Sequence, residues 1–194
     1  MDRQNRGIWQ VPKSKWRLGI PLGGLLALAL GVIGWVGFEA SLHWSSTDEF
    51  CTSCHNSPSA WVAEEWHQTA HFKTPSGVAV HCHDCHIPKE FVDKIWVKGT
   101  SAVHHIYTQL TGTYTDKASF EARREMLAQR VWDKMRANDS RECRNCHKVE
   151  RMDPAAQSPT AAQFHEVLAD ADGEVTCIDC HAGIAHNLPG SAAQ

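Results

Sequence analysis

Eight cysteines and four histidines repeat one short pattern, and this pattern is the clearest chemical signal in the sequence. In each of four segments, two residues separate a pair of cysteines and a histidine directly follows the second cysteine. Such a pair can attach one haem c through two thioether bonds, which leaves the adjacent histidine placed to bind the iron. We therefore expect four covalently bound haems. The cysteines are Cys51, Cys54, Cys82, Cys85, Cys143, Cys146, Cys177 and Cys180, and the motif histidines are His55, His86, His147 and His181.

Two other uses of paired cysteines explain the pattern less well. Zinc ribbons also pair cysteines three positions apart, but they do not need a histidine at the next position. Disulfide bonds form in oxidising compartments, yet they need no adjacent histidine either. Because the histidine recurs in all four segments, covalent haem attachment is the favoured interpretation.

An apolar run near the N-terminus predicts a membrane anchor. Residues 18–38 contain no formally charged side chain. As a helix they would span about 31 Å, the thickness of a bilayer's hydrocarbon core. The sequence at 38–40 lacks the small residue that begins a signal-peptidase site, so we expect the helix to be retained. The alternative is a buried core helix, which is disfavoured because the run is apolar on all sides and follows a basic tail.

The charge distribution predicts how this anchor is oriented. The chain carries a formal charge of −3, but residues 1–17 hold five basic side chains against one acidic side chain. The basic flank of a membrane helix normally stays in the cytoplasm, so residues 39–194 should lie in the periplasm, anchored to the inner membrane of a bacterium. Nucleic-acid binding is disfavoured because the basic residues gather in this short tail and leave the remaining chain acidic.

Residues 39–194 should form one compact multihaem domain, mostly α-helical with much irregular loop. About 39 residues accompany each expected haem, so the macrocycles must supply much of the apolar core, and this segment should not fold without them. The first cysteines of successive motifs are 31 residues apart in the first half and 34 apart in the second. This similarity indicates two dihaem halves, at about residues 45–110 and 138–188.

Local signals predict two helices that carry candidate iron ligands. Ser57 and Ser158 each precede a proline, the arrangement of an N-cap followed by proline in the first turn. The helices that start there should carry His71 and His165, respectively.

Two longer helices are expected between the halves. The first should start near residue 88 and run past residue 107, with Lys98 and His105 on one face because seven residues make two turns. The second should run from about residue 116 to residue 137 and act as a structural spacer.

Histidines outside the motifs are numerous enough to supply second iron ligands. A haem that only transfers electrons generally needs a ligand on its second face, and the identity of that ligand tunes the potential. The nine remaining histidines are His43, His67, His71, His81, His83, His104, His105, His165 and His186.

The residues around the last two motifs carry a family resemblance. Residues 138–142 lead into the CRNCH motif, and the CIDCH motif is followed by Ala-Gly-Ile-Ala-His at 182–186. Together with the anchor, these segments resemble the NapC/NirT family of membrane-anchored tetrahaem quinol dehydrogenases. The resemblance implies a periplasmic haem domain that oxidises quinol from the membrane pool and passes the electrons to a periplasmic reductase.

The resemblance also implies roles for four residues outside the motifs. His186, five positions after the last motif histidine, matches the second ligand of the second haem. His71 matches a ligand to a haem of the other half, the third, and His165 matches the partner of the fourth haem. Lys98, twelve residues after a motif histidine, matches a lysine that lines the quinol pocket beside the first haem.

Two positions depart from the family pattern, and both are near the first haem. Ser57 stands where the family often has a methionine that binds the iron, so His55 is the default ligand. His105 stands where the family tends to have a carboxylate. Either His105 accepts a proton from the quinol, for which its ordinary pKa is suitable, or it binds the first iron. His104, His81 and His83 are weaker candidates for the same roles.

The expected function is therefore transfer of electrons from quinol to a periplasmic partner such as a nitrate- or nitrite-type terminal reductase. One alternative runs the same route backwards, with a periplasmic multihaem cytochrome feeding a quinone reductase. Another is a tethered electron carrier without quinone chemistry. A homo-oligomer or a stable complex with the redox partner is compatible with the sequence.

Overall fold

The structure is a computed structural model that describes residues 7–11, 20–53, 57–170 and 174–191. Cys54 and His55 of the first motif, and most of the basic N-terminal tail, lie outside these residues. Every regular element in the described part is a helix, which confirms the expected mostly helical chain with irregular connections. The chain divides into two units, Met1–Ser46 and Thr47–Gln194.

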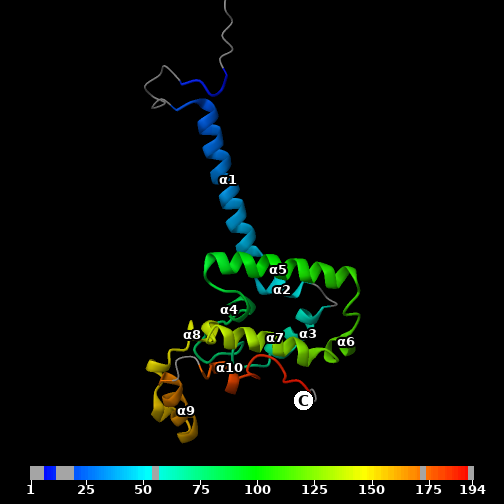
Figure 1. Ribbon diagram of the computed structural model, residues 1–194, viewed down its shortest axis with the longest axis vertical. Coiled ribbons are helices and arrows are strands. Elements are labelled where there is room, and N and C mark those ends of the chain that lie inside the picture. The colour runs from blue at the N-terminus through cyan, green and yellow to red at the C-terminus, as the bar shows by residue number, and fades with distance from the viewer. Residues whose placement is uncertain (1–6, 12–19, 54–56, 171–173, 192–194) are drawn as a thin grey trace, which may run out of the picture. The chain divides into compact units, whose positions relative to one another are not determined.

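The first unit contains one long apolar helix, α1 (Leu22–Trp44) (Figure 1). It starts directly after Pro21, because proline is compatible with the start of a helix but not with its interior. Among the described residues it is the one helix long and apolar enough to cross a membrane, with a mean hydropathy of 1.9. The helix continues past the predicted boundary at residue 38, which therefore falls inside it.

The second unit combines two longer helices, α5 and α7, with several much shorter ones (Figure 1). Its α-helices are α2 (Asp48–Thr52), α3 (Pro58–Trp66), α4 (Cys82–His86), α5 (Phe91–Leu110), α6 (Lys117–Glu121), α7 (Arg124–Ala137), α8 (Arg141–Arg144), α9 (Pro159–Asp170) and α10 (Cys177–Cys180). Two 3₁₀ turns, η2 (Val149–Arg151) and η3 (Pro154–Ala156), precede α9.

The second and fourth motifs each form a single helical turn, α4 and α10. Asp84 and Asp179 cap the N-termini of these turns. The Asp84 carboxylate accepts a hydrogen bond of 2.9 Å from the His81 backbone N–H, and the Asp179 carboxylate accepts one of 2.8 Å from the Thr176 backbone N–H. One turn brings residues i and i+3 to the same side of a helix. Both cysteines of each pair therefore face one way, as attachment to a single macrocycle requires.

The helix expected to carry His71 is shorter than predicted. Helix α3 starts at Pro58 as expected but ends at Trp66, and His71 lies in the turns that follow. The Thr69 hydroxyl donates a hydrogen bond of 2.8 Å to the Trp66 carbonyl, and such a bond competes with continuation of the helix. The matching prediction for His165 is confirmed, because α9 carries it.

The two longer predicted helices also differ in detail from the structure. Helix α5 begins at Phe91 rather than near residue 88. The helix predicted over 116–137 is broken into α6 and α7. At the break, the Arg123 guanidinium donates a hydrogen bond of 3.0 Å to the Thr113 carbonyl, which ties the junction to the preceding loop.

The protein supplies very little apolar core of its own. Of the hydrophobic residues described, only Ala63, Trp66, Phe120 and Ile178 are buried. A unit of about 150 residues normally buries a much larger share of its apolar surface. This deficit is what we expect if large apolar groups absent from the polypeptide fill the interior.

A buried ion pair connects three distant segments of the second unit. The side chains of Arg124 on α7 and Glu65 on α3 are each 8% exposed, and Nη2 of the arginine lies 2.5 Å from Oε1 of the glutamate. Arg124 also donates to Glu121 at 2.6 Å. The other Glu65 oxygen accepts a hydrogen bond of 2.8 Å from the Asn187 backbone N–H. The pair therefore holds the segment directly after His186 against α3.

We predict that Arg124→Met destabilises the haem-loaded protein by about 3–5 kcal/mol, because it leaves the Glu65 carboxylate buried without its partner. Urea unfolding followed by the visible absorbance of the haems measures the loss. Lys117→Met is the control, since Lys117 pairs with Glu64 at 3.8 Å in a solvent-exposed position and should cost less than about 1 kcal/mol. Equal losses in the two variants would contradict a structural role for the buried pair.

Candidate haem and electron-transfer site

Three of the motif histidines each lie beside a histidine from a distant part of the chain. The ring centroids within each pair are 6.1–6.2 Å apart. The pairs are His86 with His186, His147 with His71, and His181 with His165. These are the three pairs that the family resemblance implied for the second, third and fourth haems.

The spacing within these pairs fits an iron between the two rings. If one imidazole nitrogen binds a metal ion from each side at about 2 Å, the centres of the two rings are roughly 6 Å apart. A zinc site would instead bring several ligands to one point. Among the described residues, no group of three or more His, Cys, Asp or Glu side chains does so. None of the seven described cysteines forms a disulfide. The spacing of the three histidine pairs therefore fits haem.

The histidine pair at the second motif, His86 and His186, is held in the neutral form that can bind a metal. Desolvation lowers the pKa of His86 to about 4, and the charge of His186 acts in the same direction. Desolvation also lowers the pKa of His186. Both rings are therefore neutral near pH 7, the form that binds a metal.

Two of the three histidine pairs join the two halves of the sequence. His71 belongs to the first half but lies beside His147 of the third motif. His186 belongs to the second half but lies beside His86 of the second motif. The two segments read from the sequence as a duplication are thus interlocked through their candidate ligands.

Asp48 connects the first motif to the second. One oxygen of its carboxylate accepts a hydrogen bond of 2.9 Å from the Cys82 backbone N–H, and the other lies 2.7 Å from Nδ1 of His81. Partial burial opposes ionisation of Asp48, but the bonds from His81 and Cys82 outweigh it and lower the pKa of the carboxyl. The same bond raises the pKa of His81. This ion pair fixes helix α2 beside the start of α4.

Similar contacts connect the second motif to the third and the third to the fourth. Burial is the main cause that raises the pKa of Cys85 to about 11. Cys143 lies close enough for the negative charge of its thiolate to contribute to this rise. The Ser140 hydroxyl, just before the third motif, accepts a hydrogen bond of 3.2 Å from the Ile178 N–H within the fourth. Neighbours in sequence are therefore neighbours in space along the series of motifs.

Lys98 lies close to the first cysteine of the first motif. A hydrogen bond from the Cys82 thiol lowers the pKa of Cys51 to about 7, and the positive charge of Lys98 contributes. Desolvation lowers the pKa of Lys98 itself. Both sulfurs become thioethers once haem is attached and no longer titrate. What remains is that Lys98 lies near enough to Cys51 for their charges to interact.

His105 lies on α5 two turns beyond Lys98. Seven residues at 1.5 Å per residue separate the two by about 10 Å along the helix, on one face. The ring centroid of His105 is 6.4 Å from that of its chain neighbour His104. Desolvation, followed by the charge of His104, lowers the pKa of His105. His55, its expected counterpart, lies outside the described residues.

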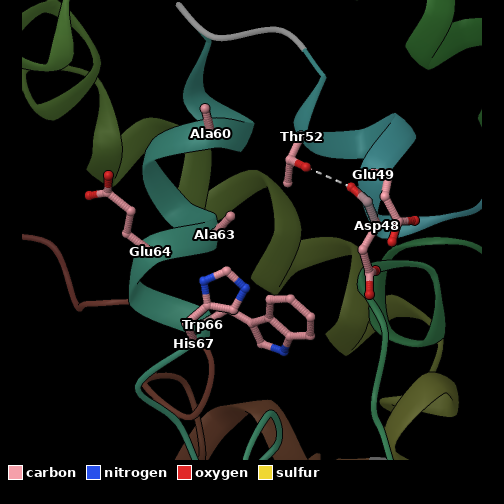
Figure 2. Close-up of a pocket in the computed structure, with 8 residues that line it drawn as sticks. All are labelled: Asp48, Glu49, Thr52, Ala60, Ala63, Glu64, Trp66 and His67. Carbon is pink, nitrogen blue, oxygen red and sulfur yellow. Dashed lines mark hydrogen bonds between the residues drawn. The ribbon is translucent and has the colours of Figure 1, made fainter.

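A hollow of about 370 Å³ lies between α3 and α2, the helix that contains Cys51 (Figure 2). The small side chains of Ala60 and Ala63 keep it open opposite Asp48, and the Trp66 ring lies at one end. Its lining residues are Asp48, Glu49, Thr52, Ala60, Ala63, Glu64, Trp66 and His67.

Sequence reasoning did not single out several residues that organise this site. Asp48 contacts a residue 34 positions away, and Arg124 contacts one 59 positions away. Gln157 contacts His165 from outside the helix that carries the histidine. No local pattern marks these residues, because each acts through a contact that only the folded chain creates.

Comparison with known proteins agrees with this geometry. Residues 13–191 match the model of the "NapC/NirT cytochrome c family, N-terminal region". The cytochrome c-type protein NapC of Escherichia coli K12 is 41% identical over 181 residues, which cover 93% of this chain and 87% of the relative. The denitrification system component NirT of Stutzerimonas stutzeri is 40% identical over 170 residues, covering 87% and 83%.

A third relative is longer than this chain. The cytochrome c-type protein TorC of E. coli K12 is 40% identical over 190 residues, which cover 95% of this chain but 46% of the relative. No solved structure matches the chain. With its cysteine–histidine motifs and the extent of these matches, the chain belongs to the NapC/NirT cytochrome c family and is a c-type cytochrome that binds haem c covalently.

Proposed function

We propose that the chain is a membrane-anchored tetrahaem quinol dehydrogenase. It takes electrons from membrane quinol and passes them through four haems to a periplasmic redox partner. The observation that carries the proposal is the set of three long-range histidine pairs, each spaced for one iron. Three such pairs arranged beside successive motifs are difficult to explain by any function other than electron transfer between haems.

The proposed ligation follows one rule for all four haems, in which a motif histidine holds one face and a distant histidine holds the other. This rule assigns His105 as the second ligand of the first haem, because it shares the face of α5 that carries Lys98. The four pairs are His55 with His105, His86 with His186, His147 with His71, and His181 with His165.

The protein residues position the quinol and the electron route, whereas haem c supplies one-electron transfer. The Lys98 ammonium can donate a hydrogen bond to a quinol oxygen at the edge of the first haem. Its positive charge stabilises the negative charge that develops on that oxygen when the hydroxyl loses its proton. The order of contacts between the motifs then provides a route between the first and the fourth haem.

The outer face of α5 supports access from the membrane. On the side away from Lys98 the helix exposes a row of apolar side chains, each 60–83% exposed. Their spacing of three, four or seven residues places them on one face. Such a face is unfavourable in water but suited to the surface of a bilayer. The residues are Val92, Trp96, Val103, Ile106 and Leu110.

The membrane placement and the partner complete the proposal. Helix α1 anchors the chain in the bacterial inner membrane, with the basic N-terminal tail in the cytoplasm and the haem domain in the periplasm. The similarity to NapC and to a denitrification component favours a nitrate- or nitrite-type terminal reductase as the electron acceptor.

We predict that Lys98→Ala slows reduction of the haems by a quinol analogue about tenfold or more, because the substrate loses its hydrogen-bond donor. Stopped-flow absorbance of the detergent-solubilised protein measures this rate. Reduction by dithionite and the haem content should not change. Lys89→Ala, an exposed lysine before α5, is the control. Unchanged quinol kinetics in Lys98→Ala would remove this residue from the site and favour a tethered carrier.

We predict that low-temperature electron paramagnetic resonance of the oxidised protein shows four low-spin haems. His105→Ala should convert one of them to high spin, because the first iron loses its second ligand. His43→Ala, in helix α1, should change none. A high-spin signal already present in the wild type, and unaffected by His105→Ala, would overturn this ligation and leave His105 available as a proton acceptor.

A further inference from the structure

We propose that Gln157 is a positioning residue that sets the reduction potential of the fourth haem through its hydrogen bond to His165. The inference rests on the proposed ligation of that haem by His165 and His181. It adds a residue that neither the motifs nor the family resemblance identifies. Gln157 immediately follows η3 and lies two residues before α9, the helix that carries His165.

The contact between the two side chains is direct. Nδ1 of His165 lies 2.6 Å from Oε1 of Gln157, and both residues are half-buried. A second hydrogen bond fixes the orientation of the amide, because Nε2 of Gln157 donates to the Asp153 carbonyl at 3.2 Å. With its nitrogen engaged there, the amide presents its oxygen to the histidine. The oxygen can only accept, so Nδ1 of His165 must carry the proton.

This tautomer leaves the lone pair of His165 on Nε2, the ring nitrogen free to bind a metal. The ring is already aligned with that of His181, since the two centroids are 6.1 Å apart and the ring planes differ by 25°. Gln157 therefore restricts both the tautomer and the rotation of the ring. Partners of this kind are known to orient metal-bound histidines and to raise their basicity.

The strength of this hydrogen bond should appear in the potential of the iron. An acceptor at Nδ1–H makes the imidazole a stronger electron donor, which stabilises the oxidised iron and lowers its potential. A neutral amide has an intermediate effect. An apolar side chain would remove the effect, and a carboxylate would strengthen it because a charged acceptor forms a stronger hydrogen bond. Substitutions at this position should thus move the potential in opposite directions.

The test is a potentiometric titration of the full-length, haem-loaded protein, followed by electron paramagnetic resonance to resolve the individual haems. Gln157→Leu should raise the potential of one haem and Gln157→Glu should lower that of the same haem. We expect each to change the reduction equilibrium constant about tenfold, which is about 59 mV for one electron. Gln163→Leu, an exposed glutamine on α9, should change no potential.

His165→Ala separates failure of this inference from failure of the ligation. If that variant turns one haem high-spin but the two Gln157 variants leave all potentials unchanged, or shift one in the same direction, the role of Gln157 is overturned and the ligation stands. If His165→Ala leaves four low-spin haems, the ligation itself fails, and the inference with it. Opposite shifts in the haem that His165→Ala converts to high spin support both.

Discussion

In the proposed ligation, the haem domain depends on one repeated interaction, an iron held between a motif histidine and a histidine from a distant segment. The polypeptide cannot replace this interaction with an apolar core, since only four hydrophobic residues of its described part are buried. We therefore expect cofactor attachment and folding to be linked. Ligand binding energy and macrocycle burial must together offset the conformational entropy that side-chain packing offsets in ordinary domains.

The same interaction explains why the halves of the sequence do not correspond to halves of the structure. His71 and His186 each cross from one half to the other. The buried Arg124–Glu65 pair reinforces the second crossing, because it also holds the Asn187 backbone next to His186. In this ligation the two segments form a single interlocked unit, in which neither could complete the ligation of all its irons alone.

A feature could be predicted from the sequence when the residues that form it lie close together along the chain. Haem attachment is local, because five consecutive residues contain both cysteines and the histidine. The helix that carries His165 could be predicted from the Ser-Pro sequence at its start. The helix before His71 ends earlier than predicted, at a turn where the Thr69 hydroxyl bonds to the Trp66 carbonyl. Gln157, Asp48 and Arg124 escaped prediction because their partners are brought near only by the fold. The break between α6 and α7 has the same origin.

The two ends of the proposed electron route have different tasks, and the protein treats them differently. Beside the first motif, Lys98 is near enough to Cys51 for their charges to interact, which places the proposed quinol-binding residue at the first haem. At the fourth motif, the chain instead fixes a ligand ring through an amide whose own orientation is secured by the Asp153 carbonyl. Quinol oxidation needs an accessible edge, whereas delivery to a protein partner needs a defined potential. An orienting hydrogen bond at the exit haem meets that second need without adding a charge.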